Sequence, residues 1–272
     1  MVKARDTVLN TFLTTAVLCI VCSVFVSASA VGLKSRQELN KQLDKKKNIL
    51  SVCQIDFSNG DVQSIYDENI QAYLVDLQTG FYAEQTPDSK QTASKFDLSK
   101  LADSEFKTLT KDPAGLGGRR ENFEVIYVFQ KGNQLVLPIR GKGLWSTLWG
   151  FLSLDANDFT TRGITFYAHG ETPGLGGEVD SDAFKNQWME ENATLDKDGK
   201  VIIEVSKAGQ AVEGEIDGLA GATITTQGVD KLIKYWLGPD GFGPFLVGNT
   251  EKFQAVAKNE QSVVGLLSWL QE

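Results

Sequence analysis

The stretch ENFEVIYVFQKGNQLVLPIRG, Glu121 to Gly141, decides the fold class. It contains two runs rich in β-branched and aromatic residues, and Lys131-Gly132-Asn133 separates them. Two such runs joined by a short segment with a glycine predict a β-hairpin. The stretch therefore predicts the centre of an antiparallel sheet.

Further strands are expected on both sides of this hairpin, because similar apolar runs recur along the chain. The strand-like runs are 72–77, 148–155, 162–169 and the two halves of 193–207, with Asp198-Gly199 as the expected turn of the last hairpin. The sheet is therefore expected to be mostly antiparallel.

Helices are expected to pack on this sheet. Apolar residues recur at helical spacing at Val229, Leu232, Ile233, Trp236 and Leu237. This stripe predicts an amphipathic helix that ends at Gly238-Pro239, with Thr225 and Thr226 as N-cap candidates. Further helices are expected over 61–72 and 181–193, and 84–112 is expected to be loop with short helix. Strands with helices packed against them predict an α+β fold for one soluble domain.

The N-terminus differs from the rest of the chain, because residues 7–33 contain no charged side chain. This run is long enough to span a bilayer as a helix. The basic start at Lys3 and Arg5, with the small residues Ala28-Ser29-Ala30, also fits a cleaved signal peptide. On the residues alone a retained anchor and a cleaved signal remain open. A charged helix, 34–55, is expected to follow as a stalk, and the soluble domain is expected over 56–272.

Composition excludes some partners. The 272 residues carry a formal net charge of −8, which argues against nucleic acid, because its phosphates are bound by Lys and Arg. Three cysteines give no disulfide framework: Cys19 and Cys22 lie in the apolar run, and Cys53 is left alone.

Three loops of small residues are candidates for a binding site. The segment DGLAGATITTQGV, 217–229, opens onto the predicted helix, where free backbone N–H groups and the helix dipole favour an anion such as a phosphate. The segments HGETPGLGGEVD, 169–180, and RGKGLWSTLWG, 140–150, add further glycines and two tryptophans that would suit a planar ring. Together they predict a site for a phosphorylated planar cofactor.

A hydrolase is a rival interpretation of the same residues. Thr223 or Ser146 would be the nucleophile, and His169 with Glu171 would be the base and the orienting acid. A domain that only binds a phosphorylated ligand, without a covalent bond, is a second alternative.

The motifs also resemble a known family. Asp217 to Thr223 looks like the flavinylation motif Asp-x-x-Ser/Thr-Gly-Ala-Thr of FMN-binding domains, and HGETPGLGG resembles the family's second signature. RGKGLWSTLWGFLSLD and YWLGPDGFGPFL are similar to the C subunits of the sodium-translocating NADH:quinone reductases, the Nqr complexes. One position departs from the motif, because Ala220 stands where the family usually has Ser or Thr.

The resemblance implies a covalent FMN and the residues that bind it. In the family a flavin transferase links FMN through its phosphate to the last threonine of the motif, which is Thr223 here. The other residues implied at the cofactor are Leu144, Trp145, Ser146, Thr147, Glu171, Thr172, Leu175, Gly176, Lys207, Gly221, Ala222 and Ile224. The resemblance identifies no catalytic residue and no metal ligand.

The resemblance also implies where the protein works. It implies an uncleaved single-pass anchor in the bacterial inner membrane, a periplasmic domain, and the other Nqr subunits as partners. The expected function is electron relay between redox centres within an oxidoreductase, with no substrate turnover by this chain alone. The G subunit of the related Rnf complex, with a similar anchor and flavin motif, is the alternative within the same class.

Overall fold

The computed structural model describes residues 8–189 and 192–248. It divides into two compact units within the first helix, between Lys45 and Lys46. The domain boundaries expected at residues 33 and 55 stay predictions. The expected anchor, 1–33, and the expected domain, 56–272, each include residues outside the described part of the chain.

The first helix, α1, runs without interruption over Val8–Val52. Among the described residues, it alone is long and apolar enough to cross a membrane. Residues 8–33 extend about 39 Å at 1.5 Å per residue, which exceeds the ~30 Å thickness of a bilayer core. Their apolar side chains are exposed, as a membrane-spanning segment requires. By its length and composition, this helix is able to anchor the chain in a membrane.

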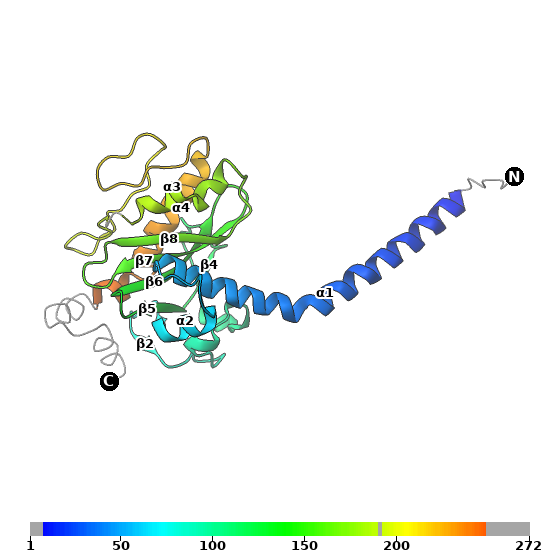
Figure 1. Ribbon diagram of the computed structural model, residues 1–272, viewed down its shortest axis with the longest axis horizontal. Helices are drawn as coiled ribbons and strands as arrows, with labels where there is room; N and C mark the ends of the chain where they lie inside the picture. The colour runs from blue at the N-terminus through cyan, green and yellow to red at the C-terminus, as the bar shows by residue number, and fades with distance from the viewer. Residues whose placement is uncertain (1–7, 190–191, 249–272) are drawn as a thin grey trace. The chain divides into compact units, whose positions relative to one another are not determined.

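The second unit is built on the expected antiparallel sheet (Figure 1). Its six strands lie in the order β2-β1-β5-β6-β7-β8, and all neighbours are antiparallel. The strands are β1 (Ile70–Asp76), β2 (Tyr82–Ala83), β5 (Phe123–Phe129), β6 (Gln134–Lys142), β7 (Thr147–Asp155) and β8 (Thr161–Ala168). The hairpin predicted from Glu121 to Gly141 is therefore confirmed as β5 and β6.

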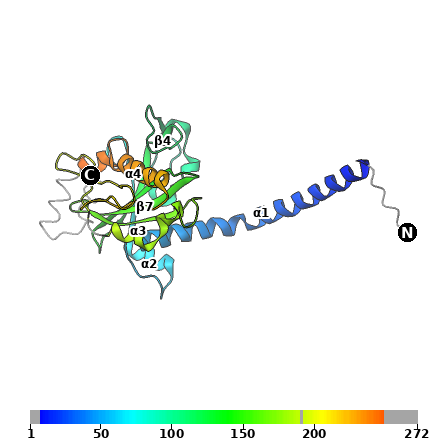
Figure 2. The same cartoon turned by 90° about the horizontal axis from the view of Figure 1, so that it is seen from above.

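Both faces of the sheet are covered by an apolar core. Each strand contributes to both cores, because successive side chains point to opposite faces. In β5, Ile126 and Val128 join one apolar core, whereas Val125 and Tyr127 join the other. The first core contains α4 (Thr223–Leu237), and the second contains α2 (Val62–Asn69) and the end of α1. Figure 2 shows α4 and α2 on opposite sides of the sheet.

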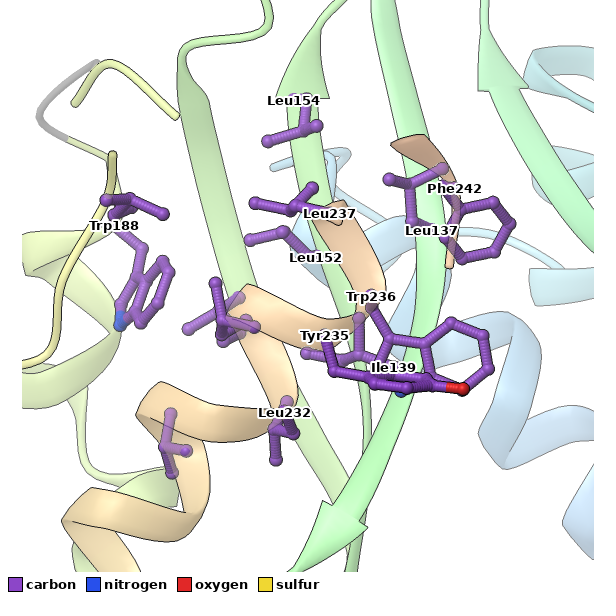
Figure 3. Close-up of a cluster of buried hydrophobic side chains, with 14 of the residues drawn as sticks. Leu137, Ile139, Leu152, Leu154, Trp188, Leu232, Tyr235, Trp236, Leu237 and Phe242 are labelled. Carbon is purple, nitrogen blue, oxygen red and sulfur yellow. The ribbon is translucent and has the colours of Figure 1, made fainter. Parts of the chain in front are cut away.

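The predicted apolar stripe of α4 is confirmed as the side that packs on the sheet. Figure 3 shows Leu232, Trp236 and Leu237 beside Leu137 and Leu152 of the central strands. Trp236 also donates a hydrogen bond from its indole Nε1 to the carbonyl oxygen of Arg140, at 2.7 Å. Apolar packing and this polar contact thus both help to orient α4.

Two predicted helices are shorter than expected. The helix over 61–72 is α2, and the chain enters β1 at Ile70 because Ile70 and Ala72 pair with β5. The helix over 181–193 is α3 (Asp182–Gln187), and the side-chain amide of Asn192 donates to the carbonyl of Gln187 at its end. Residues 190–191 of that prediction lie outside the described residues.

The hairpin predicted over 193–207 forms only in part. Across its turn the backbone N–H of Asp196 donates to the Lys200 carbonyl, and that of Ile202 donates to the Thr194 carbonyl. The turn at Asp198-Gly199 is present, but only isolated bridges form, between Leu195 and Val201 and between Val205 and Ile216. The backbone N–H of Val205 donates instead to the carboxylate of Asp230 on α4, at 3.1 Å. Attachment to the helix replaces a regular strand ladder.

Residues 84–112 form loops with short helices, as expected. Three 3₁₀ turns occur there: η1 (Ala93–Lys95), η2 (Leu98–Lys100) and η3 (Asp103–Glu105). They lead into a small second sheet that the sequence analysis did not anticipate, in which β3 (Phe106–Thr108) pairs with β4 (Arg119–Glu121).

Candidate functional site

The start of α4 forms the centre of the candidate site. The expectation that Thr225 or Thr226 caps this helix is wrong, because the helix begins at Thr223 and Ala222 is the N-cap. Alanine has no side-chain acceptor, and the first turn carries no acidic residue. The first backbone N–H groups of a helix have no partner within the helix, and the dipole makes this end positive. The helix start therefore suits an anion.

The three threonines of this turn are in different surroundings. Thr225 is 1% exposed and donates its hydroxyl to Glu171 Oε2 at 2.7 Å. Thr226 is also buried, and its hydroxyl accepts from the backbone N–H of Leu219 at 3.0 Å. Thr223 is exposed. Thr223 is thus the threonine of this turn with an accessible hydroxyl.

Glu171, in the loop after β8, connects separate parts of the site. Its carboxylate accepts hydrogen bonds from the backbone N–H groups of Leu144, Trp145 and Ser146 at 3.0 to 3.2 Å, besides the bond from Thr225. Burial raises the pKa of this carboxyl, but the bond from Thr225 and the three backbone bonds outweigh burial and hold the pKa below its ordinary value. Glu171 is therefore a buried, ionised group.

The turn between β6 and β7 points its apolar side chains outward. Its backbone closes through a bond from Gly143 N to the Ser146 carbonyl, at 2.8 Å. The Ser146 hydroxyl accepts from the backbone N–H of Gly170 at 2.6 Å, which joins this turn to the Glu171 loop. Leu144 is 41% exposed and Trp145 is 68% exposed. The turn thus offers apolar surface, while its N–H groups are bound to Glu171.

The loop after Glu171 brings further residues to α4. The carbonyl of Thr172 accepts from the N–H groups of Leu175 and Gly177, and the 3₁₀ turn η4 (Gly176–Asp180) follows. Leu175 is exposed, and a Cβ added to Gly221 would lie 3.1 Å from its Cδ2 atom. Leu175 therefore lies beside the small-residue segment that precedes α4.

Two glycines allow the loops to approach one another. A Cβ on Gly143 would lie 2.6 Å from Glu171 Oε1, and a Cβ on Gly176 would lie 2.6 Å from the Thr225 hydroxyl. Real Cβ atoms essentially never come this close. Glycine at these two positions is therefore required by contacts within the protein.

Most of the predicted site residues therefore lie in one region. Leu144, Trp145 and Ser146 are linked to Glu171, which is linked to α4. Thr147 begins β7 and pairs with Lys142, and Ile224 is 55% exposed in the first turn of α4. Lys207 is also exposed, after Ser206, whose carbonyl packs against Gly218.

The geometry does not support the hydrolase interpretation. His169 Nε2 lies 3.0 Å from an Asp180 carboxylate oxygen, and its Nδ1 accepts from the backbone N–H of Glu171 at 3.3 Å. The Glu171 carboxylate bonds to a backbone turn and to Thr225. The expected pair of His169 with the Glu171 carboxylate does not form.

Two residues of this site were not predicted from the sequence. Thr225 was expected only as a helix cap, and Gly143 was assigned no role. The signal for Thr225 was weak, because the partner of its buried hydroxyl, Glu171, lies 54 residues earlier in the sequence.

These features fit a phosphate that carries a planar apolar group. The uncapped helix start and exposed Thr223 suit the phosphate, and Gly221, at φ of 72°, lets the backbone come close without a Cβ. Exposed Leu144, Trp145, Leu175 and Ile224 offer apolar surface nearby.

Comparison of the chain with known proteins indicates one family. The FMN-binding domain family matches residues 143–238, from the Gly143 turn to the end of α4. The C subunit of the Na(+)-translocating NADH-quinone reductase of Yersinia pestis is 40% identical over 257 residues, which are 90% of this chain and 94% of that protein. The chain belongs to the family of these C subunits.

Other members of this family agree in sequence and in structure. The C subunit of Pseudomonas aeruginosa is 39% identical over 92% of this chain and 99% of its own length. The crystal structure of NqrC from Shewanella oneidensis matches with a TM-score of 0.67 and 27% identity, over 79% of this chain and 99% of that one. The C subunit of Parabacteroides distasonis matches with a TM-score of 0.62, 29% identity and coverages of 79% and 96%. The α+β fold expected from the sequence is confirmed.

Proposed function

We propose that this chain is the membrane-anchored C subunit of a sodium-translocating NADH:quinone reductase, and that it carries FMN bound covalently through its phosphate to Thr223. The observation that supports this most is the uncapped start of α4, where Thr223 is exposed while Thr225 and Thr226 are buried. The match to the FMN-binding domain family supports FMN as the cofactor, and the identity to the C subunits supports the reductase as the complex.

The chain's own residues bind and position the cofactor in this proposal. Backbone groups of residues 221–224 and the positive end of α4 surround the phosphate. The exposed side chains of Leu144, Trp145 and Leu175, with Thr172 and Gly176, flank the ring and the ribityl chain. FMN supplies the electron chemistry, and the protein sets its position and its electrostatic surroundings.

The covalent step forms one phosphoester. The Thr223 Oγ–P bond forms, the hydroxyl proton leaves, and a P–O bond to the leaving group of the flavin donor breaks. The net product is threonine plus FMN less water. A flavin transferase is the proposed catalyst, because the segment from Asp217 to Thr223 resembles the motif that such transferases modify.

The bound cofactor serves as an electron relay between redox centres of the complex. The other Nqr subunits are the proposed partners. A covalent bond would prevent loss of FMN in a compartment that has no free pool of it.

The apolar helix α1 and the C-subunit family support a membrane location. We place α1 as an uncleaved single-pass anchor in the bacterial inner membrane and the domain on the periplasmic side. The lysines from Lys34 to Lys47 would favour the cytoplasm by the positive-inside rule, but long domains translocate largely regardless of charge.

Two alternatives make different predictions. A domain that binds FMN without a covalent bond would lose it on denaturation. An Rnf-type G subunit would assemble with a different complex, and the 40% identity to Nqr C subunits over most of the chain favours the Nqr assignment.

The test is the intact mass of the full-length protein, purified from membranes that contain the transferase and then denatured. We expect an added mass of FMN less water in the wild type and in Thr225→Ser, and its loss in Thr223→Ala. An unmodified wild-type protein, or a modified Thr223→Ala variant, would overturn the covalent assignment. The same spectrum shows whether residues 1–30 remain attached.

A further inference from the structure

Glu171 binds two segments that lie far from it in the sequence, one before it and one after it. Its carboxylate binds the turn at Leu144 to Ser146, which lies 25 to 27 residues earlier, and Thr225, which lies 54 residues later. Thr225 lies two residues after Thr223 on α4, and the turn lies against the same helix, because a Cβ on Gly228 would lie 3.3 Å from Gly143 Cα. One side chain therefore connects the two halves of this site.

The two carboxylate oxygens divide this work. Oε1 accepts from the N–H groups of Trp145 and Ser146, at 3.0 and 3.2 Å. Oε2 accepts from Leu144 N at 3.2 Å and from the Thr225 hydroxyl at 2.7 Å. The bond to Thr225 is the shortest of the four, and it links Glu171 to the first turn of α4.

The buried carboxylate of Glu171 would be unfavourable without its hydrogen-bond donors. Glu171 is 6% exposed, and a buried carboxylate is tolerated only where hydrogen bonds or charges compensate it. Three backbone N–H groups and one hydroxyl supply that compensation. Gly143 and Gly176 leave no room for a Cβ beside the carboxylate, so Glu171 has little freedom to move.

We propose that Glu171 is the positioning residue of the cofactor site, which fixes the Leu144–Ser146 turn relative to the first turn of α4. It acts through protein groups, and the inference rests on the proposed function because it concerns the same FMN. Glu171 accepts hydrogen bonds from the N–H groups of the turn, so the turn presents the side chains of Leu144 and Trp145 to the cofactor. The N–H groups at the start of α4 remain for the phosphate.

The link to Thr225 provides the sharpest test. Thr225→Val removes the hydroxyl at nearly constant shape and leaves the three backbone bonds to Glu171, whereas Thr225→Ser keeps the hydroxyl. Glu171→Gln removes the charge, and Glu178→Gln is the matched control, because Glu178 is an exposed glutamate in the same loop. Glu171→Gln combined with Thr225→Val completes a double-mutant cycle.

The measurements are made on the full-length chain expressed in cells that contain the transferase. They are the rate of flavin incorporation, followed by fluorescence in denaturing gels, and the visible circular dichroism and reduction potential of the purified protein. We expect Glu171→Gln and Thr225→Val to incorporate flavin roughly tenfold to a hundredfold more slowly, since a displacement of ~1 Å can cost about a hundredfold. Both should change the flavin dichroism and the potential, and the double variant should be little worse than either alone.

The controls separate this role from general stability and from the proposed function. Thr225→Ser and Glu178→Gln should match the wild type in all three measurements. If Thr225→Val is folded and has wild-type incorporation, dichroism and potential, the positioning role is wrong while the covalent flavin stands. Additive effects in the cycle would likewise refute the coupling. If the wild-type chain never acquires flavin, the proposed function fails first.

Discussion

A single methyl group at Gly143 should disrupt the candidate site from a distance. In Gly143→Ala the new Cβ would lie 2.6 Å from Glu171 Oε1 and 2.9 Å from its Cδ atom. Ordinary van der Waals contact begins at 3.4 Å, so Glu171 would have to move by about 0.8 Å. It cannot withdraw without lengthening the bonds from Trp145 and Ser146, which are already 3.0 and 3.2 Å.

The expected cost follows from overpacking. Inserting a methyl group into a packed site typically costs about 1–3 kcal/mol. For a domain of this size that corresponds to a fall in Tm of roughly 2–12 °C, at about 2–4 °C per kcal/mol. The incorporation of flavin should slow as well, because the Leu144–Ser146 turn is displaced.

Gly170→Ala is the matched control. Gly170 lies in the Glu171 loop, but its Cβ would lie 3.4 Å from the nearest atoms of Ser146, which is ordinary contact. Thermal unfolding by circular dichroism and flavin content from denaturing gels would be measured for both variants. If Gly143→Ala is as stable and as fully flavinylated as Gly170→Ala, the close contact between residue 143 and Glu171 does not constrain the site.

Three further predictions concern other parts of the chain. Burial raises the pKa of Glu105, but hydrogen bonds from Ser89, Asp88 and Ala102 lower it from 4.5 to about 2. Because the pKa of Glu105 is lower in the folded state than in the unfolded state, its ionised carboxylate stabilises the fold at pH values above about 4.5. This stabilisation is lost as the pH falls from about 4.5 towards 2. Urea unfolding at several pH values should therefore show a shallower loss of stability over this range in Glu105→Gln than in the wild type, and equal slopes would contradict it. Leu232→Ala should lower the free energy of unfolding by about 2–5 kcal/mol in urea, because Leu232 is fully buried on the side of α4 that packs on the sheet. Val212 is exposed, so Val212→Ala should change this free energy by no more than about 0.5 kcal/mol. Ala220→Ser restores the hydroxyl that the flavinylation motif usually carries, so we expect faster flavin incorporation in a time course of gel fluorescence. Because Ala220 is exposed, Tm should not change. An unchanged rate would show that the missing hydroxyl at position 220 does not slow flavin incorporation.

Local patterns in the sequence determined the main elements of the fold. The alternating runs of 121–141 predicted β5 and β6, and the apolar spacing from Val229 to Leu237 predicted α4. The uncharged run at the N-terminus predicted a helix able to span a membrane. Such patterns succeed because each records which face of one element is buried, a property of neighbouring residues.

The same patterns failed where distant contacts decide the structure. Residues 201–206 have the composition of a strand, but Asp230 of α4 takes the backbone N–H of Val205, and the ladder does not form. Ile70 appeared to continue a helix, but its pairing with Phe129 draws it into the sheet. Hydrogen bonds between remote segments outweighed local propensity in both cases.

The candidate site shows the same division. The sequence by itself predicted the small-residue loops and, through the motifs that resemble the family, Thr223 and Glu171 as site residues, because motifs are local. Only the tertiary structure showed that Glu171 accepts from both the Leu144 turn and Thr225, and that Thr225 and Thr226 are buried while Thr223 is exposed. The physical reason is that a buried carboxylate needs several donors, and here they come from segments that the sheet and α4 bring together from 25 to 54 residues away.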